Sequence, residues 1–216
     1  DGYPDDPESR KKTRTLAADR QVPNSPYPYE KGRPFFWRTG AGLADINGDG
    51  LADLVTHDGF TRKATLFVQY RDASGKLRLK KDRALTLTDG RAIDDSIVGR
   101  KQHWTESFRS ADWDGDGRVD LIYSCAGSVG TSSIYLLRNA GTAGEPVFEP
   151  PRTLCCFGEP IKVTNHGPHP SVADLNGDGK PDLLTCVEWS VYPFYCHAAI
   201  EMPERPKYVL SQPRKR

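Results

Sequence analysis

A nine-residue acidic pattern occurs three times in this chain, as DINGDGLAD at residues 45–53, DWDGDGRVD at 112–120 and DLNGDGKPD at 174–182. We call these segments loop 1, loop 2 and loop 3. Each has Asp at positions one, five and nine, Asp or Asn at position three, and Gly at positions four and six. Because like charges this close repel one another, the pattern requires a source of positive charge.

The spacing of the loops predicts an array of similar units. Their first aspartates are residues 45, 112 and 174, which are 67 and 62 residues apart. In each unit a short strand precedes the loop and an apolar strand follows it. A third strand is expected at 65–72, 133–139 and 190–197, and a fourth at 76–87, 146–154 and 206–210. Four strands per unit are typical of a propeller blade. We therefore predict an all-β fold with little helix, a β-propeller or partial propeller of four-stranded blades.

The repeat also predicts the domain organisation. Residues 37–210 are expected to form three blades, followed by a basic tail at 211–216. Residues 1–36 are polar and proline-rich, so we expect an N-terminal arm or the remnant of a preceding blade. Three blades do not close a ring, because propellers use about four to eight. Further blades are expected from a longer chain or an oligomer.

Calcium is the expected source of positive charge. Ca²⁺ takes six to eight oxygen ligands, and glycine permits the sharp turn that wraps a loop around it. An oxygen-only ligand set argues against zinc or copper. We predict three structural Ca²⁺ sites, with side-chain ligands at positions one, three, five and nine and a backbone carbonyl at position seven: Asp45, Asn47, Asp49, Leu51 and Asp53; Asp112, Asp114, Asp116, Arg118 and Asp120; Asp174, Asn176, Asp178, Lys180 and Asp182.

Two other interpretations of the loops compete with the calcium site. Asx-rich turns form without metal, because Asp, Asn and Gly favour turns. The recurrence of the pattern three times in register favours the metal site. An EF-hand requires flanking helices and a Glu at position twelve, where this chain has Thr56, Tyr123 and Thr185.

The loop pattern, with a small-residue strand before it and an apolar strand after it, resembles the FG-GAP or VCBS-type repeat of calcium-binding β-propellers. The resemblance covers about residues 36–210, although the Phe-Gly and Gly-Ala-Pro signatures are degenerate here. Such repeats are found in integrin α-subunit heads, in lectins and in several polysaccharide lyases. The resemblance implies the fold, calcium and a secreted, periplasmic or cell-surface location, and it leaves the activity open.

Tryptophan, arginine, histidine and glutamate residues lie just before the first strands of the predicted blades, near the expected mouth of the central channel. Aromatic rings there can stack on sugars, and arginine can hold a carboxylate by two bonds. The alternative is packing between blades and local hydrogen bonding. The candidate ligand-binding residues of this blade-end rim are Trp37, Arg38, His103, Trp104, Glu106, His166 and His169, together with Trp189, which lies beyond a predicted second strand.

These residues support a binding module for a polysaccharide or an extracellular protein partner. One alternative is a polysaccharide lyase, with His103 or His169 as the base, Arg38 as the carboxylate neutraliser and Tyr192 or Tyr195 as the acid. No spacing in the sequence fixes these roles, so the enzyme is the less favoured hypothesis. Another alternative is a structural domain that completes a larger propeller.

Charge and hydropathy argue against two classes of partner. The 30 basic residues nearly balance the 29 acidic ones, which argues against binding of nucleic acid. No apolar run approaches the ~20 residues that a membrane-spanning helix needs.

Overall fold

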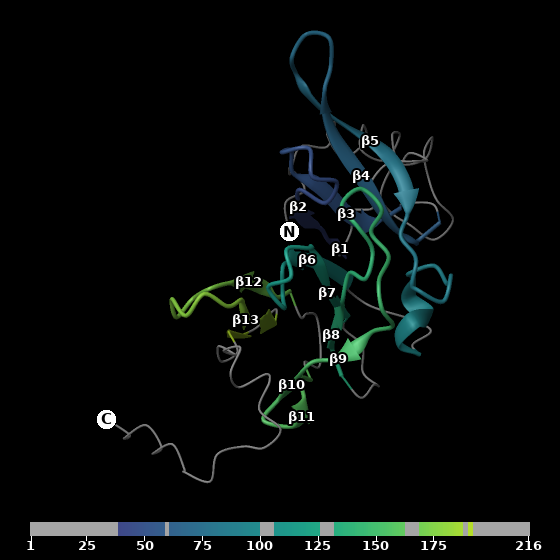
Figure 1. Cartoon of the computed structure of the whole chain (residues 1–216). Coiled ribbons are helices and arrows are strands. Elements are labelled where there is room, and N and C mark those ends of the chain that lie inside the picture. The colour runs from purple at the N-terminus through teal and green to yellow at the C-terminus, as the bar shows by residue number, and fades with distance from the viewer. Residues whose placement is uncertain are drawn as a thin grey trace, which may run out of the picture.

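The structure is a computed structural model, and it describes residues 39–58, 61–99, 106–125, 132–162, 169–187 and 190–191. Within these ranges the chain forms β-strands and one short 3-10 helix, η1 (Asp95–Val98) (Figure 1). The predicted all-β fold is confirmed for this part of the chain. No helix in it has the length and apolar character needed to cross a membrane.

The first sheet is the predicted four-stranded antiparallel unit. Its strands lie in the order β2 (Gly42–Ala44), β3 (Asp53–His57), β4 (Ala64–Arg71) and β5 (Leu77–Ala84). Loop 1 joins β2 to β3. The β4–β5 hairpin projects at the top of Figure 1, and β5 is exposed along its whole length. Its Lys and Arg side chains discourage pairing with another strand at this edge.

The second sheet repeats this order around loop 2. Its antiparallel strands are β6 (Glu106–Ala111), β7 (Asp120–Cys125), β8 (Ile134–Leu137) and β9 (Arg152–Thr153). The fourth strand, expected over residues 146–154, is reduced to two residues. Pro150 and Pro151 precede it, and proline cannot donate to a ladder. Phe148 instead forms isolated bridges with Leu87 and Asn139.

The third unit is described in part. Loop 3 joins β12 (Ser171–Ala173) to β13 (Asp182–Leu184), which pair antiparallel. Two short hairpins flank this pair, β10 (Cys155–Cys156) with β11 (Glu159–Pro160), and β14 (Cys186–Val187) with β15 (Ser190–Val191). The third predicted strand, 190–197, begins at β15, and the fourth, 206–210, lies outside the described residues.

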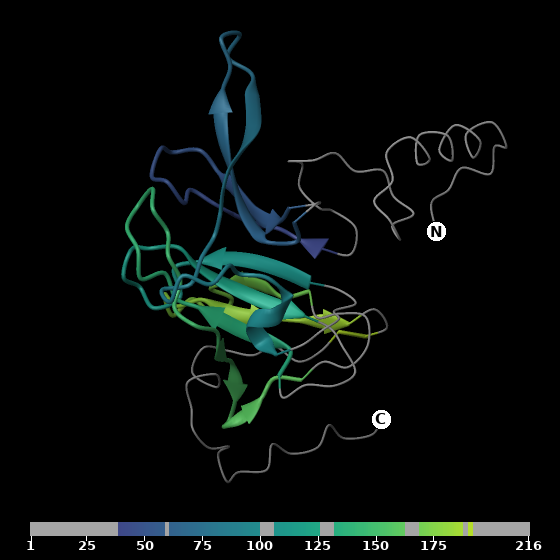
Figure 2. The same cartoon turned by 90° about the vertical axis from the view of Figure 1, so that its right-hand side faces the viewer.

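Two hydrophobic clusters join these units. Val55 and Leu66 of the first sheet pack in one cluster with Phe108 of the second. The other cluster brings Ile122 of the second sheet together with Leu183 of the third unit. Figure 2 shows the first sheet above the second. Because the second sheet is covered by both neighbours, every residue of β7 is buried.

A short strand that the sequence did not predict connects the first two sheets. β1 (Thr39–Gly40) pairs parallel with the start of β6, and the chain then enters the first sheet at β2. A Cβ atom on Gly40 would lie 2.5 Å from the Cβ of Ser107, so glycine is needed for this close approach. Arg109 strengthens the link, because its Nη1 donates to the carbonyl of Ala41 at 3.2 Å.

Candidate metal centre

Loops 1 and 3 share one conformation, built around their first aspartate. In loop 1, Asp45 accepts hydrogen bonds from the backbone N–H groups of Gly48, Asp49 and Gly50 at 2.7, 3.0 and 2.8 Å. In loop 3, Asp174 accepts the equivalent bonds at 2.7, 3.2 and 2.9 Å. The glycines at positions four and six have φ of 79° and 84° in both loops, a left-handed conformation that favours glycine.

The amide at position three partners the aspartate at position five in these two loops. Asn47 Nδ2 donates to Asp49 Oδ2 at 3.0 Å, and Asn176 Nδ2 donates to Asp178 Oδ2 at 3.0 Å. This donor is neutral, so it satisfies one carboxylate oxygen without cancelling its charge.

The aspartate at position nine is buried in all three loops and ties each loop to its own sheet. Asp53, Asp120 and Asp182 are 0%, 1% and 0% exposed. In each case Oδ2 accepts a backbone N–H from position two of the loop, at 3.2, 3.1 and 2.9 Å. The Oδ1 atom of Asp53 accepts from the N–H of Gln69, and that of Asp120 from the N–H of Asn139. The ninth carboxylate therefore has an architectural role, and its role as a metal ligand stays a prediction.

Burial sets the electrostatics of these ninth carboxylates. It raises the pKa of Asp53 and of Asp120 above the ordinary value of 3.8, and the N–H groups that they accept partly offset this rise. The nearby carboxylates of Asp114 and Asp116 raise the pKa of Asp120 further. A cation in the loop favours the ionised form, so metal binding counteracts all of these unfavourable contributions.

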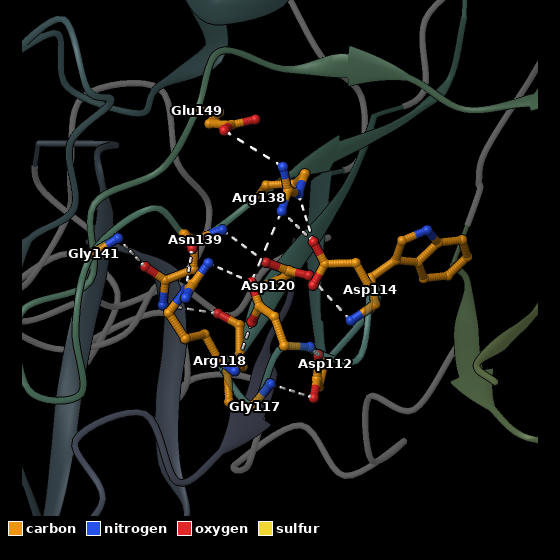
Figure 3. Close-up of polar contacts among 12 residues, drawn as sticks. Asp112, Asp114, Gly117, Arg118, Asp120, Arg138, Asn139, Gly141 and Glu149 are labelled. Carbon is orange, nitrogen blue, oxygen red and sulfur yellow. Dashed lines mark hydrogen bonds and ion pairs between the residues drawn. The ribbon is translucent and has the colours of Figure 1, made fainter. Parts of the chain in front are cut away.

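Loop 2 has the same backbone turn with different side-chain partners (Figure 3). Asp112 accepts from the N–H groups of Asp116 and Gly117 at 3.0 and 2.9 Å. Position three is Asp114, and its Oδ2 accepts from Arg138 through Nε at 2.7 Å and also through Nη2. Asp116 accepts from Nη2 of Arg118. Two guanidinium groups therefore face the carboxylates of this loop.

The carboxylates of loop 2 fit a calcium ion. Asp112, Asp114 and Asp116 are exposed, and each offers an oxygen that lies within 4.8 Å of the other two. Calcium binds oxygen at 2.3–2.6 Å, so two ligands of one ion lie at most about 5 Å apart. Within the described residues this is the one group of three acidic side chains with such spacing. Loops 1 and 3 offer two carboxylates and an amide oxygen at the same positions.

The residues at position seven are held in the same way in all three loops. The N–H groups of Leu51, Arg118 and Lys180 each donate to Oδ1 of the aspartate at position five, at 2.9 Å. These bonds fix the backbone around the predicted carbonyl ligands. Ligation by the carbonyls themselves stays a prediction.

A groove of about 680 Å³ lies between loop 2 and loop 3 and gives solvent access to the carboxylates of loop 2. Sequence analysis missed it, because it combines two loops with residues that follow β8 and begin β9. Its lining residues are Asp112, Trp113, Asp114, Gly115, Arg138, Arg152, Gly179, Lys180 and Pro181.

Comparison with known families agrees with this geometry. Residues 112–185, from the start of loop 2 to just beyond β13, match the model of the FG-GAP-like repeat. The chain contains an FG-GAP-like repeat. This confirms the predicted resemblance over the matched residues, which include loops 2 and 3. A search of curated proteins finds no match to the chain.

Most of the predicted rim residues lie outside the described part of the chain. Only two of the candidates, Glu106 and His169, belong to it. His169 precedes β12 inside the FG-GAP-like repeat, and Glu106 precedes the repeat. The remaining candidates are Trp37, Arg38, His103, Trp104, His166, Trp189, Tyr192 and Tyr195.

Glu106 differs from its predicted role as an exposed rim residue. It is the first residue of β6 and is 2% exposed, between the first and second sheets. Its Oε2 lies 3.0 Å from Nε2 of His57 and 3.5 Å from Nη2 of Arg62. The His57 ring is also buried, 5.0 Å from the Phe108 ring. The strand begins earlier than the sequence suggested, so Glu106 stabilises the junction of two sheets instead of facing solvent.

His169 is half-buried near Arg109, a residue that sequence reasoning missed. Burial lowers the pKa of His169 below its ordinary value of 6.5, and the positive charge of Arg109 lowers it further. Arg109 lies within β6, a strand of mixed polar and apolar residues. The sequence does not mark a charged residue in such a strand as functional. The neutral imidazole is therefore the favoured form of His169 at neutral pH, which suits a hydrogen-bonding residue or a base.

We expect an NMR titration of His169 to give a pKa below 6.5, and Arg109→Gln to raise it. A histidine with a lowered folded pKa contributes stability above pH 6.5, and this contribution is lost as the pH falls through the folded value. Arg109→Lys is the control, because it keeps the positive charge and should keep the pKa low. A pKa that does not respond to Arg109→Gln contradicts the proposed influence of Arg109.

Proposed function

We propose that this chain is part of a calcium-stabilised extracellular β-propeller that binds a polysaccharide or a surface partner at its blade-end rim. The proposal depends on one observation. The same backbone turn occurs in all three units, with oxygen atoms that can bind a metal at the same positions. The role proposed for calcium is structural: it fastens the turn between the first two strands of each blade. Loops rich in protein oxygens leave little room on the ion for a substrate.

The four-stranded antiparallel sheets support the propeller part of this proposal. FG-GAP repeats typically form propeller blades, and the first two sheets here pack on each other through a common core. Completion of the ring is proposed to come from further blades in a longer chain or from an oligomer.

Calcium chemistry supports an extracellular, periplasmic or cell-surface location. Extracellular calcium modules bind the ion with Kd of about 10⁻⁴–10⁻³ M. Weak binding of this kind is expected here, because the loops are exposed and lack the bidentate Glu that an EF-hand has at position twelve. Such sites fill only where calcium is abundant, and the proposed location provides that condition.

A glycan array tests the binding function directly. The protein is applied in millimolar calcium and in EGTA, beside a panel of purified extracellular proteins on the same surface. We expect retention of a polysaccharide or protein in calcium and its loss in EGTA. Failure to retain any probe in calcium, by a protein that is folded and elutes as an oligomer, contradicts binding at the rim and favours the assembly domain.

A polysaccharide lyase is the second candidate, and the influence of the positive charge of Arg109 on His169 favours it. A neutral imidazole can abstract a proton, and a guanidinium can neutralise the adjacent carboxylate. Uronate-rich polysaccharide offered to the protein should then yield an unsaturated product that absorbs in the ultraviolet. Retention of the polysaccharide without this absorbance excludes the lyase and supports the binding module.

A further inference from the structure

We propose that loop 2 binds calcium more weakly than loops 1 and 3, because Arg118 and Arg138 already neutralise its carboxylates. This inference rests on the proposed role of calcium and adds that the three sites form two classes. Loops 1 and 3 fill first and hold the fold, and loop 2 fills only at higher calcium concentration.

The difference begins at position three of the loops. In loops 1 and 3 an asparagine amide donates to the carboxylate at position five at 3.0 Å. In loop 2 this neutral donor is replaced by the carboxylate of Asp114, which receives Arg138 Nε at 2.7 Å. The extra negative charge of loop 2 is therefore matched by a positive charge from outside the loop.

Arg138 is held in this position from both sides (Figure 3). Besides its two bonds to Asp114, its Nη2 lies 3.8 Å from Asp116, and its Nη1 lies 3.6 Å from Glu149. The bond to Asp114 is the largest cause of a raised pKa for Arg138. The guanidinium of Arg138 is thus held against the same carboxylates that a calcium ion would bind.

Arg118 is the second positively charged side chain that contacts the carboxylates of loop 2. Its Nη2 donates to Asp116, while its Nε donates to the carbonyl of Asn139 at 2.7 Å and anchors the side chain. The residues at the same position in the other loops are Leu51 and Lys180. Lys180 forms no ion pair within the described residues, so loop 3 lacks this contact.

These contacts lower the expected affinity of loop 2 for calcium relative to that of loops 1 and 3. In loop 2 an ion must displace the two guanidinium groups or accept their repulsion at close range, and either option reduces the affinity. At positions one, three and five of loops 1 and 3 the ion replaces no charged partner among the described residues. Because Asp112, Asp114 and Arg138 line an open groove, exchange between arginine and calcium can take place at the surface.

The test is a calcium titration of the whole chain by isothermal titration calorimetry, with native mass spectrometry to count the bound ions. The wild type is expected to bind two ions with similar affinity and a third more weakly. Arg138→Gln should tighten the weak site by about tenfold, because it removes a positive charge next to the ion. Asp112→Asn should abolish the weak site and so assign it to loop 2.

Two control variants separate charge from packing. Arg138→Lys keeps the positive charge and should leave the weak site weak. Arg91→Gln removes an exposed arginine whose Nη2 lies 2.8 Å from Asp89, away from the loops, and should leave every site unchanged. Three sites of equal affinity, or a weak site that Arg138→Gln does not tighten, overturn the inference and leave structural calcium intact. Failure of all variants to bind calcium overturns both proposals.

Discussion

Removal of calcium with EGTA is expected to lower the Tm of this protein by about 15–30 °C. A ligand at one hundred times its Kd stabilises the folded state by about 2.7 kcal/mol per site, which amounts to about 8 kcal/mol for three sites. In a chain of this size each kcal/mol changes the Tm by about 2–4 °C. Without the ion, the clustered carboxylates of loops 1 and 3 lose their main neutralising charge, whereas those of loop 2 keep their contacts with Arg118 and Arg138.

Differential scanning calorimetry measures this effect at pH 7, with calcium at saturation for all three loops and then with excess EGTA. Addition of calcium after EGTA should restore the original Tm, whereas magnesium should restore little of it, because Mg²⁺ demands a smaller octahedral site. An unchanged melting curve in EGTA argues that the hydrogen bonds of the loops suffice without metal.

Glu106→Ala is expected to destabilise the fold by about 1–3 kcal/mol, the usual cost of leaving a buried polar group without its partner. The substitution leaves Nε2 of His57 without the carboxylate that lies 3.0 Å away, and both side chains are buried between two sheets. Arg62 also loses a contact at 3.5 Å. Urea denaturation in saturating calcium measures the change in the free energy of unfolding.

Glu145→Ala is the matched control. Glu145 has a side-chain exposure of 80% and lies 3.7 Å from Arg83, so the same substitution should cost less than about 0.5 kcal/mol. Glu106→Gln keeps the shape of the side chain and should fall between the two. Equal stabilities of Glu106→Ala and Glu145→Ala show that the Glu106–His57 contact does not join the sheets.

The local structure of this protein can be predicted from its sequence because the acidic loops are encoded locally. Most of the backbone N–H groups that donate to the Asp and Asn side chains of loops 1 and 3 lie two to seven residues away, and the bond from Gln69 to Asp53 is an exception. Within these loops glycine occupies the positions with positive φ. Given these turns, the apolar runs that follow become strands, and the four-stranded order of the first two sheets follows.

Contacts between distant residues were not predictable in the same way. Arg138 reaches Asp114 across 24 residues, and Glu106 meets a histidine from another sheet. Neither pair has a periodicity or spacing that marks it in the sequence. The same holds for β1, whose parallel pairing with β6 depends on the packing of two sheets. Proline does carry a local signal, and Pro150 with Pro151 explains why β9 is shorter than predicted.

Diffraction from crystals grown in millimolar calcium, recorded at a long wavelength where calcium scatters anomalously, tests the central claim most directly. Anomalous peaks are expected within the three loops, each surrounded by the carboxylate and amide oxygens at positions one, three and five. Crystals that diffract well and show the same turns with no anomalous density in any loop contradict calcium binding by the loops.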